Sequence, residues 1–182
     1  MAVPAHAGKD GDLVMVHVEW LKCFACVFLM MLFAVGPGFA GEPAVAPLLK
    51  PLAEWRRLLP ADRYAILFEE KTEGAFSSPL DKEKRPGTFV CAACLVPLFE
   101  AKSKFDSGTG WPSFFAPLPG RVETKHDYRL FTPRTEYHCA RCGGHQGHVF
   151  DDGPAPTGKR WCNNGLALIF VAAGEPLPAL RQ

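Results

Sequence analysis

The sequence predicts a mainly β domain, built from short strands and many turns and held together by a metal site. The 182 residues contain 17 glycines and 17 prolines, and this high content of both residues favours short strands over long helices. Two C-x-x-C pairs, Cys91/Cys94 and Cys139/Cys142, can supply the four sulfur ligands of a structural zinc site. The length suits one domain with extensions at its ends.

Charge and cysteine content narrow the classes of function. The formal net charge of +1 at pH 7 leaves no long-range field to attract nucleic acid, and no basic stripe is interleaved with aromatic residues. We therefore expect no nucleic-acid partner. Of the 7 cysteines, the two pairs account for four, and Cys162 is left as a candidate nucleophile. Cys23 and Cys26 lie in an apolar N-terminal segment.

The N-terminal segment is expected to direct export. An unbroken apolar run over 23–35 is shorter than the roughly 20 residues that a membrane span needs. Small residues near its end resemble a cleavage site, which predicts a signal peptide over 1–40, cut after Ala40. A retained membrane anchor and a buried core helix are the alternatives, and Met15 is an alternative start. The signal predicts a periplasmic or other extracytoplasmic protein.

The segments around the domain are assigned from composition and periodicity. Residues 41–53 are rich in proline and alanine and are predicted to be a linker. Helical spacing of apolar residues begins at Leu52, and Pro60 can open a second short helix. The folded domain is expected over 54–172, followed by a tail over 173–182.

Each cysteine pair follows a predicted strand. Residues 88–90 are β-branched and aromatic and lead into Cys91, and residues 97–99 suggest the return arm of a hairpin. Residues 135–138 lead into Cys139 in the same way. One zinc ion per chain would clamp these two hairpins together, although they are far apart in sequence. In an exported protein the two pairs could instead form disulfides.

A glycine turn precedes a tryptophan in the middle of the chain. Gly108 and Gly110 predict a sharp bend, and Trp111 directly after it can line a pocket for a small apolar group. An ordinary buried tryptophan has the same signature. Residues 121–132 are expected to form two strands with a turn near 126–127.

Two histidines follow the second cysteine pair. His145 and His148 lie among Gly143, Gly144 and Gly147, which predicts a loop and not a helix face. As metal ligands they would be superfluous, because four thiolates already complete a zinc site. They are either part of a reaction centre or ordinary turn histidines at the surface.

Cys162 has the surroundings of a reactive cysteine. Lys159 and Arg160 place two cations just before it, and positive charge favours a thiolate and lowers its pKa. Asn163 and Asn164 follow, and either can hydrogen-bond a bound polar group. A buried, unreactive thiol is the alternative.

Three longer motifs, together with both cysteine pairs, resemble the B-type, R-specific methionine sulfoxide reductases. The motifs are GTGWPSF (108–114), CGGHQGHVFDDGP (142–154) and RWCNNG (160–165). The resemblance covers roughly 55–171. It implies two antiparallel sheets with short N-terminal helices, a structural zinc held by four cysteines, and reduction of methionine R-sulfoxide in oxidised proteins or peptides.

The resemblance also implies roles for individual residues. Cys162 would be the nucleophile, and His145 and His148 would bind and protonate the sulfoxide oxygen. Asn164 would orient the same polar cluster, and Arg160 would support the thiolate. The remaining roles are Trp111 against the substrate methyl group and Cys91, Cys94, Cys139 and Cys142 as zinc ligands.

The sequence departs from many family members in two places. Members with a resolving cysteine often carry it in the glycine turn, where this chain has Thr109. With the other cysteines used or removed, the resulting sulfenic acid would be reduced directly by a thioredoxin-like protein or a small thiol. After the nucleophile, Asn163 and Gly165 replace the more usual apolar residue and serine, which affects substrate preference and not the reaction.

A second class of function fits part of the pattern. A non-catalytic, zinc-stabilised module that binds a ligand or a protein would need the four paired cysteines, but it would not need Cys162 after two histidines. The enzyme is therefore the preferred hypothesis, and we expect it to be a monomer.

Overall fold

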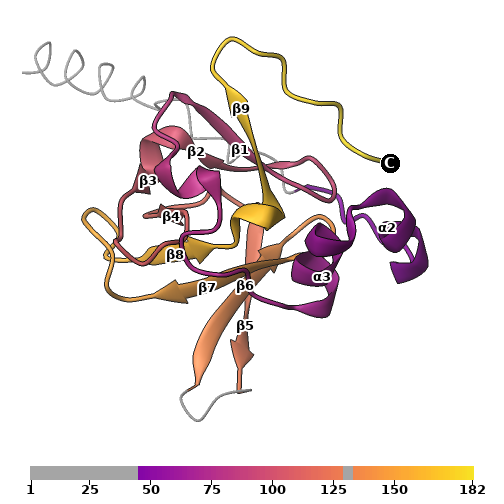
Figure 1. Cartoon of the computed structure of the whole chain (residues 1–182), viewed down its shortest axis with the longest axis horizontal. Coiled ribbons are helices and arrows are strands. Elements are labelled where there is room, and N and C mark those ends of the chain that lie inside the picture. The colour runs from indigo at the N-terminus through magenta and orange to yellow at the C-terminus, as the bar shows by residue number, and fades with distance from the viewer. Residues whose placement is uncertain (1–44, 129–132) are drawn as a thin grey trace, which may run out of the picture. The chain divides into compact units, whose positions relative to one another are not determined.

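The computed structural model describes residues 45–128 and 133–182, and the signal peptide predicted over 1–40 lies outside these residues. The described chain contains a three-stranded and a six-stranded sheet with antiparallel pairing throughout, accompanied by two short α-helices (Figure 1). The predicted fold class is therefore confirmed.

Both predicted helices are present at the start of the described chain. They are α2 (Leu52–Leu58) and α3 (Ala61–Glu69), and a proline directly precedes each one, where its fixed φ suits entry into a helix. Trp55 of α2 is buried and stacks on Phe68 of α3, with ring centroids 5.2 Å apart. The described residues also contain three 3-10 turns: η1 (Pro79–Lys82), η2 (Ala101–Ser103) and η3 (Gly165–Ala167).

The smaller sheet brings together the two ends of the β region. Its strand order is β2-β1-β9, formed by β1 (Gly87–Cys91), β2 (Pro97–Glu100) and β9 (Leu168–Ala172). The β1–β2 hairpin confirms the predicted strand before Cys91 and its return arm. On the other edge of β1, pairing with β9 runs from Gly87 opposite Ala172 to Cys91 opposite Leu168.

The larger sheet carries Cys162 and the two histidines His145 and His148. Its strand order is β3-β4-β8-β7-β6-β5. Its strands are β3 (Lys104–Phe105), β4 (Ser113–Phe114), β5 (Val122–Asp127), β6 (Arg134–Cys139), β7 (His145–Phe150) and β8 (Arg160–Asn163).

An aromatic core joins the two sheets. Phe99 of β2 stacks on Phe114 of β4 with centroids 4.2 Å apart, and Phe89 of β1 meets the edge of the same ring at 5.0 Å. Tyr137 of β6 meets Phe99 edge-on. All four rings are fully buried, and burying each such side chain stabilises the fold by about 1.5–3 kcal/mol.

Two sequence-based expectations about strands were wrong. Residues 145–147 form the start of β7 and not a loop. Gly147 does not form a turn here; it allows the neighbouring strand β8 to come close. A Cβ on Gly147 would lie 1.9 Å from the carbonyl oxygen of Cys162 on β8. The turn expected near 126–127 is also absent, since β5 continues to Asp127 and pairs with β6 as far as Arg134.

Candidate active site

Cys162 lies in the middle of the larger sheet, between two polar neighbours. It pairs with Ser113 on β4 and with His148 on β7, so these three side chains occupy one face of adjacent strands. A small pocket of about 110 Å³ opens at this point. It is lined by Thr72, Trp111, Arg134, Gly147, His148, Phe150, Cys162, Asn163 and Asn164.

The surroundings of the Cys162 thiol act on its pKa in opposite directions. Burial raises the pKa of the thiol above its ordinary value, whereas the Arg160 charge and hydrogen bonds from Thr109, Ser113 and Arg160 lower it. The net shift is upward because burial is the largest of these effects, although the Arg160 charge lowers the pKa in the direction predicted from the sequence. The three donors stabilise the thiolate once it forms.

The aspartates of the β7–β8 loop pair with both cations that precede Cys162. The Arg160 guanidinium donates two hydrogen bonds to Asp152, at 2.8 and 2.9 Å, and lies over the Phe150 ring. Lys159 pairs with Asp151 at the surface. The two carboxylates therefore partly neutralise the positive charge next to Cys162.

A bulge brings the two histidines together. Residues three apart on a regular strand point to opposite faces. Here Tyr137 pairs with Gly147 while His138 pairs with His145, so Gln146 is an extra residue that shifts the phase of β7. As a result the rings of His145 and His148 lie 5.6 Å apart in an edge-to-face arrangement.

Each histidine is oriented by a buried carboxylate. His145 Nδ1 lies 2.7 Å from Glu136, and His148 Nε2 lies 2.9 Å from Asp127. Because an ionised carboxylate only accepts hydrogen bonds, these nitrogens carry the protons. The other nitrogen of each ring is then a lone pair in the neutral form, and Nε2 of His145 is buried without a protein partner.

Burial dominates the pKa of both imidazoles. Desolvation lowers the pKa of His145 and of His148, and the hydrogen bonds from Glu136 and Asp127 raise it to a smaller extent. Both rings are therefore neutral at pH 7 in the resting protein. The carboxylates nevertheless remain in place to stabilise an imidazolium formed during a reaction.

The four paired cysteines converge at one point away from Cys162. Cys91 ends β1, Cys139 ends β6, and the sulfur atoms of all four lie within 4.8 Å of one another. The Sγ–Sγ distances are 3.7 Å for Cys91 and Cys142 and 3.6 Å for Cys94 and Cys139. A disulfide requires about 2.05 Å, so neither of these two contacts is a disulfide. All four cysteines are free thiols, and together they form a possible metal site.

Comparison with known proteins agrees with this geometry. The family model described as "SelR domain" matches residues 59–172, which include both cysteine pairs, the two histidines and Cys162. The chain belongs to the SelR domain family. The fold and the family expected from the sequence motifs are therefore both confirmed.

Relatives of this SelR domain carry consistent names. Two chloroplastic proteins named peptide methionine sulfoxide reductase B1, from Oryza sativa subsp. japonica and Arabidopsis thaliana, are 51% and 49% identical over 63% and 65% of this chain. The matched regions span only 54% and 59% of those two relatives. The peptide methionine sulfoxide reductase MsrB of Methanosarcina barkeri is 48% identical over 67% of this chain and 87% of its own length.

The expectation of export is wrong. The relatives from Oryza sativa and Arabidopsis thaliana are named as chloroplastic proteins, which is a different destination from the periplasm or the cell exterior. Within residues 45–128 and 133–182, no helix is both long and apolar enough to cross a membrane.

The structure explains both departures from the family pattern after Cys162. The Asn163 amide points into the core, where it donates to the Tyr137 hydroxyl at 2.9 Å, so a polar residue is accommodated there. At Gly165 a Cβ would lie 1.9 Å from the Ser78 hydroxyl, so a serine could not fit in this position without movement of the neighbouring loop.

Several residues of the site were missed from the sequence. Glu136 and Asp127 orient the histidines from neighbouring strands, and alternation along β5 and β6 gives no sign of that contact. Ser113 and Thr109 lie within the glycine–tryptophan motif but attracted no attention as hydroxyl donors. Nothing in the sequence indicated that Glu73 is buried, although a carboxylate that is 8% exposed needs partners.

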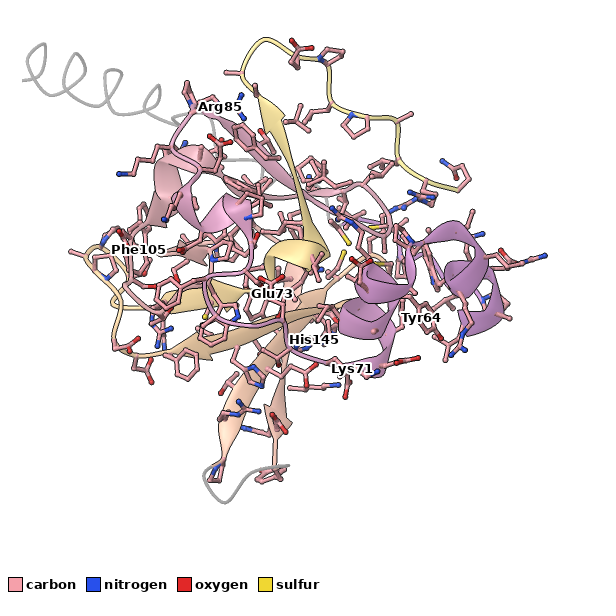
Figure 2. All side chains as sticks on the ribbon, viewed as in Figure 1. Tyr64, Lys71, Glu73, Arg85, Phe105 and His145 are labelled. Atoms are coloured by element: carbon pink, nitrogen blue, oxygen red, sulfur yellow. The ribbon has the colours of Figure 1, made fainter. Side chains whose placement is uncertain are left out.

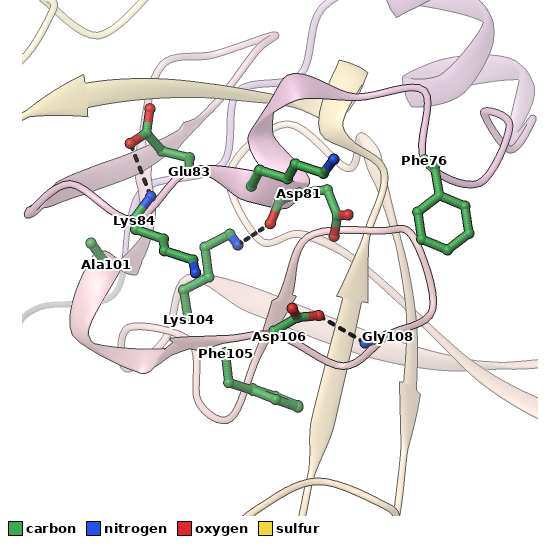
Figure 3. Close-up of a pocket in the computed structure, with 10 residues that line it drawn as sticks. Phe76, Asp81, Glu83, Lys84, Ala101, Lys104, Phe105, Asp106 and Gly108 are labelled. Carbon is green, nitrogen blue, oxygen red and sulfur yellow. Dashed lines mark hydrogen bonds between the residues drawn. The ribbon is translucent and has the colours of Figure 1, made fainter.

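A larger cavity of about 920 Å³ lies elsewhere and has a different character (Figure 3). Its lining is mixed in charge: Asp106 accepts a hydrogen bond from the Gly108 N–H, and Lys104 donates to the backbone carbonyl of Asp81. It contains none of the cysteines or histidines described above. We therefore place the candidate active site in the smaller pocket at Cys162.

Proposed function

We propose that this protein reduces methionine R-sulfoxide, in oxidised proteins or peptides, to methionine. The observation that carries the proposal is the placement of Cys162 directly opposite His148, in a pocket that Trp111 also lines. A thiol, an imidazole and an aromatic wall are the groups that attack on a sulfoxide sulfur requires. The names of the relatives support the same reaction.

The chemistry assigns one step to each group. The neutral imidazole of His145 or His148 accepts the proton of the Cys162 thiol, and the resulting thiolate attacks the sulfoxide sulfur while the sulfoxide oxygen gains that proton from the imidazolium. The oxygen is transferred to the Cys162 sulfur as a sulfenic acid, and methionine leaves. Thr109, Ser113 and Arg160 stabilise the thiolate before attack.

The side chains that line the pocket select the substrate in this proposal. The Trp111 ring packs against the methyl group of the sulfoxide, and Asn164 orients the polar side. Asn164 is itself fixed, because its amide donates to the Gln146 carbonyl oxygen at 3.1 Å. A pocket of about 110 Å³ suits the end of one side chain and not a larger group.

An external thiol completes the cycle. Among the residues that the structure describes, Thr109 makes a hydrogen bond to Cys162 at the position where some family members carry a second cysteine, and the four paired cysteines form a separate cluster. The sulfenic acid is therefore reduced by two equivalents of thiol, which yield one disulfide and one water. A thioredoxin-like protein or a small thiol fits this role.

We propose that the four paired cysteines hold one structural zinc ion. Four sulfurs around zinc at about 2.3 Å form a tetrahedron with edges of about 3.8 Å, close to the 3.6 and 3.7 Å separations found here. Contact with the Cys139 sulfur, together with burial, raises the pKa of the Cys91 and Cys142 thiols. A cation is needed to hold four thiolates this close together.

The decisive experiment supplies the full chain with both sulfoxide epimers of a blocked methionine and dithiothreitol. Loss of the R epimer alone, and no loss with Cys162→Ser, is the expected result. Equal activity in Cys162→Ser, or reduction of the S epimer, would overturn the proposal. Binding of the sulfoxide without turnover would favour a non-catalytic module.

A further inference from the structure

Glu73 occupies an unusual position for a carboxylate. It lies in the loop between α3 and η1, yet its side chain is buried against the turn η3 that follows Cys162 (Figure 2). Its carboxylate accepts hydrogen bonds from the backbone N–H groups of Gly165 at 2.6 Å and Leu166 at 2.9 Å. These two bonds tie the loop to the turn, and bonds to a charged acceptor are stronger than neutral ones.

The backbone of the same residue reaches both walls of the Cys162 pocket. The Glu73 N–H donates to the side-chain oxygen of Asn164 at 3.0 Å. The Trp111 indole N–H donates to the Glu73 carbonyl oxygen at 3.2 Å. One residue therefore contacts the aromatic wall, the amide wall and the turn directly behind the candidate nucleophile.

The neighbouring residues restrict where this loop can lie. Gly165 has no space for a side chain, since a Cβ there would lie 1.9 Å from the Ser78 hydroxyl and 3.2 Å from the Glu73 carboxylate. Gly110, next to Trp111, is similarly close to the backbone of Phe76, whose N–H donates to the Gly110 carbonyl at 2.7 Å. The loop is therefore packed between the two segments that line the pocket.

We infer that Glu73 is a positioning residue, whose carboxylate clamps the loop to the η3 turn and thereby fixes Trp111 and Asn164 around the pocket. The inference rests on the proposed function for its kinetic consequence, but the clamp itself is a property of the fold. Glu73 does not contact Cys162 in any interaction described, so it acts on substrate binding and not on the thiol.

The test compares Glu73→Gln with wild type in two ways. We expect KM for the R-sulfoxide to rise about tenfold while kcat changes by less than about threefold, because the oriented walls are lost but the thiol environment is kept. In a ¹H–¹⁵N spectrum, the Trp111 indole resonance, assigned with Trp111→Phe, should shift and exchange faster with solvent. The matched control, Glu175→Gln in the exposed tail, should change neither quantity.

A second substitution keeps the inference falsifiable if Glu73→Gln does not fold. Gly165→Ala displaces the same loop from the opposite side and should move the same indole resonance. Gly74→Ala is its control, because a Cβ there meets only Ser77 Cβ at 3.9 Å. An unmoved indole resonance with an unchanged KM in Glu73→Gln, or an unmoved resonance in Gly165→Ala, would overturn the inference. If the wild-type chain reduced no sulfoxide, the proposed function would fail. The indole resonance would still test whether Glu73 holds Trp111 in position.

Discussion

Ser113 lies directly opposite Cys162 across the β4–β8 pair, and its hydroxyl is part of a hydrogen-bonded chain. The Ser107 hydroxyl lies 2.8 Å from the hydroxyls of both Thr109 and Ser113. Hydrogen bonding with Thr109 and Ser113 in turn lowers the pKa of the Cys162 thiol. The Thr109 and Ser113 hydroxyls thus add to the Arg160 charge, which is the largest of the effects that lower the pKa of the Cys162 thiol.

Removal of either hydroxyl donor should slow the reaction of Cys162 with iodoacetamide. Ser113→Ala and Thr109→Val each remove a bond worth about 0.5–1.5 kcal/mol, which raises the thiol pKa further and reduces the thiolate fraction at pH 7.5 about two- to tenfold. The alkylation rate, followed by mass spectrometry, measures the effect. Thr124→Val on exposed β5 is the matched control, and an unchanged rate in both site variants would show that the hydroxyls do not support the thiolate.

Thr109→Cys should change the product of turnover. A sulfur at this position lies within reach of Cys162, since the threonine side chain already contacts it. One turnover without reductant should leave wild type with a sulfenic acid that dimedone traps, whereas Thr109→Cys should form an internal disulfide and resist dimedone. An internal disulfide in the wild-type chain would mean that one of the paired cysteines, or Cys23 or Cys26 of the N-terminal segment, reaches Cys162.

Loss of one paired cysteine should cost both metal and stability. Cys94→Ser is expected to reduce zinc from about one ion per chain to almost none, and to lower the free energy of unfolding by several kcal/mol, because structural zinc binding contributes directly to folding. Elemental analysis and urea denaturation measure the two effects. Cys162→Ser removes a thiol outside the cluster and should retain both zinc and stability; two disulfides and no metal in wild type would refute the site.

Stability should fall as the pH is lowered below about 6.5. The folded pKa values of His145 and His148 are lowered by burial, so between these values and the ordinary pKa of about 6.5 the unfolded chain binds more protons than the folded one. The free energy of unfolding therefore decreases with falling pH in this window. Urea denaturation at pH 7.5 and 5.5 should show a smaller decrease in His145→Gln than in wild type.

His126→Gln provides the reference for that experiment. His126 is exposed on β5 and should leave the pH dependence unchanged. Equal pH dependence in wild type and both variants would show that the buried imidazoles do not couple to folding.

Local signals in the sequence predicted much of the fold. The strands before Cys91 and Cys139 were predictable because β-branched and aromatic residues precede each cysteine pair. The helices were predictable because helically spaced apolar residues begin at Leu52 and because Pro60 can open a second helix. The segment 145–147 was misassigned because glycine has two uses: it permits turns, and it also permits another strand to come close, as Gly147 does beside Cys162.

The sequence predicted the residues that line the candidate site, but not the residues that hold them in position. Cys162, His145, His148, Trp111 and Asn164 stand in recognisable motifs, and all except His145 line the same pocket, with the His145 ring adjacent to that of His148. Their catalytic and binding roles remain predictions. The supporting carboxylates Glu73, Asp127 and Glu136 come from other strands and loops, and their contacts depend on tertiary packing that no local pattern contains.

The pairing of β1 with β9 has a consequence for synthesis of the protein. A ribosome makes β1 and β2 early, but the second edge of β1 must wait until every other strand of the domain has been translated. During that interval an apolar strand has an open hydrogen-bonding edge, which is a site for aggregation. Nascent chains are therefore most vulnerable just before β9 emerges, when a chaperone that covers exposed strand edges would protect them best.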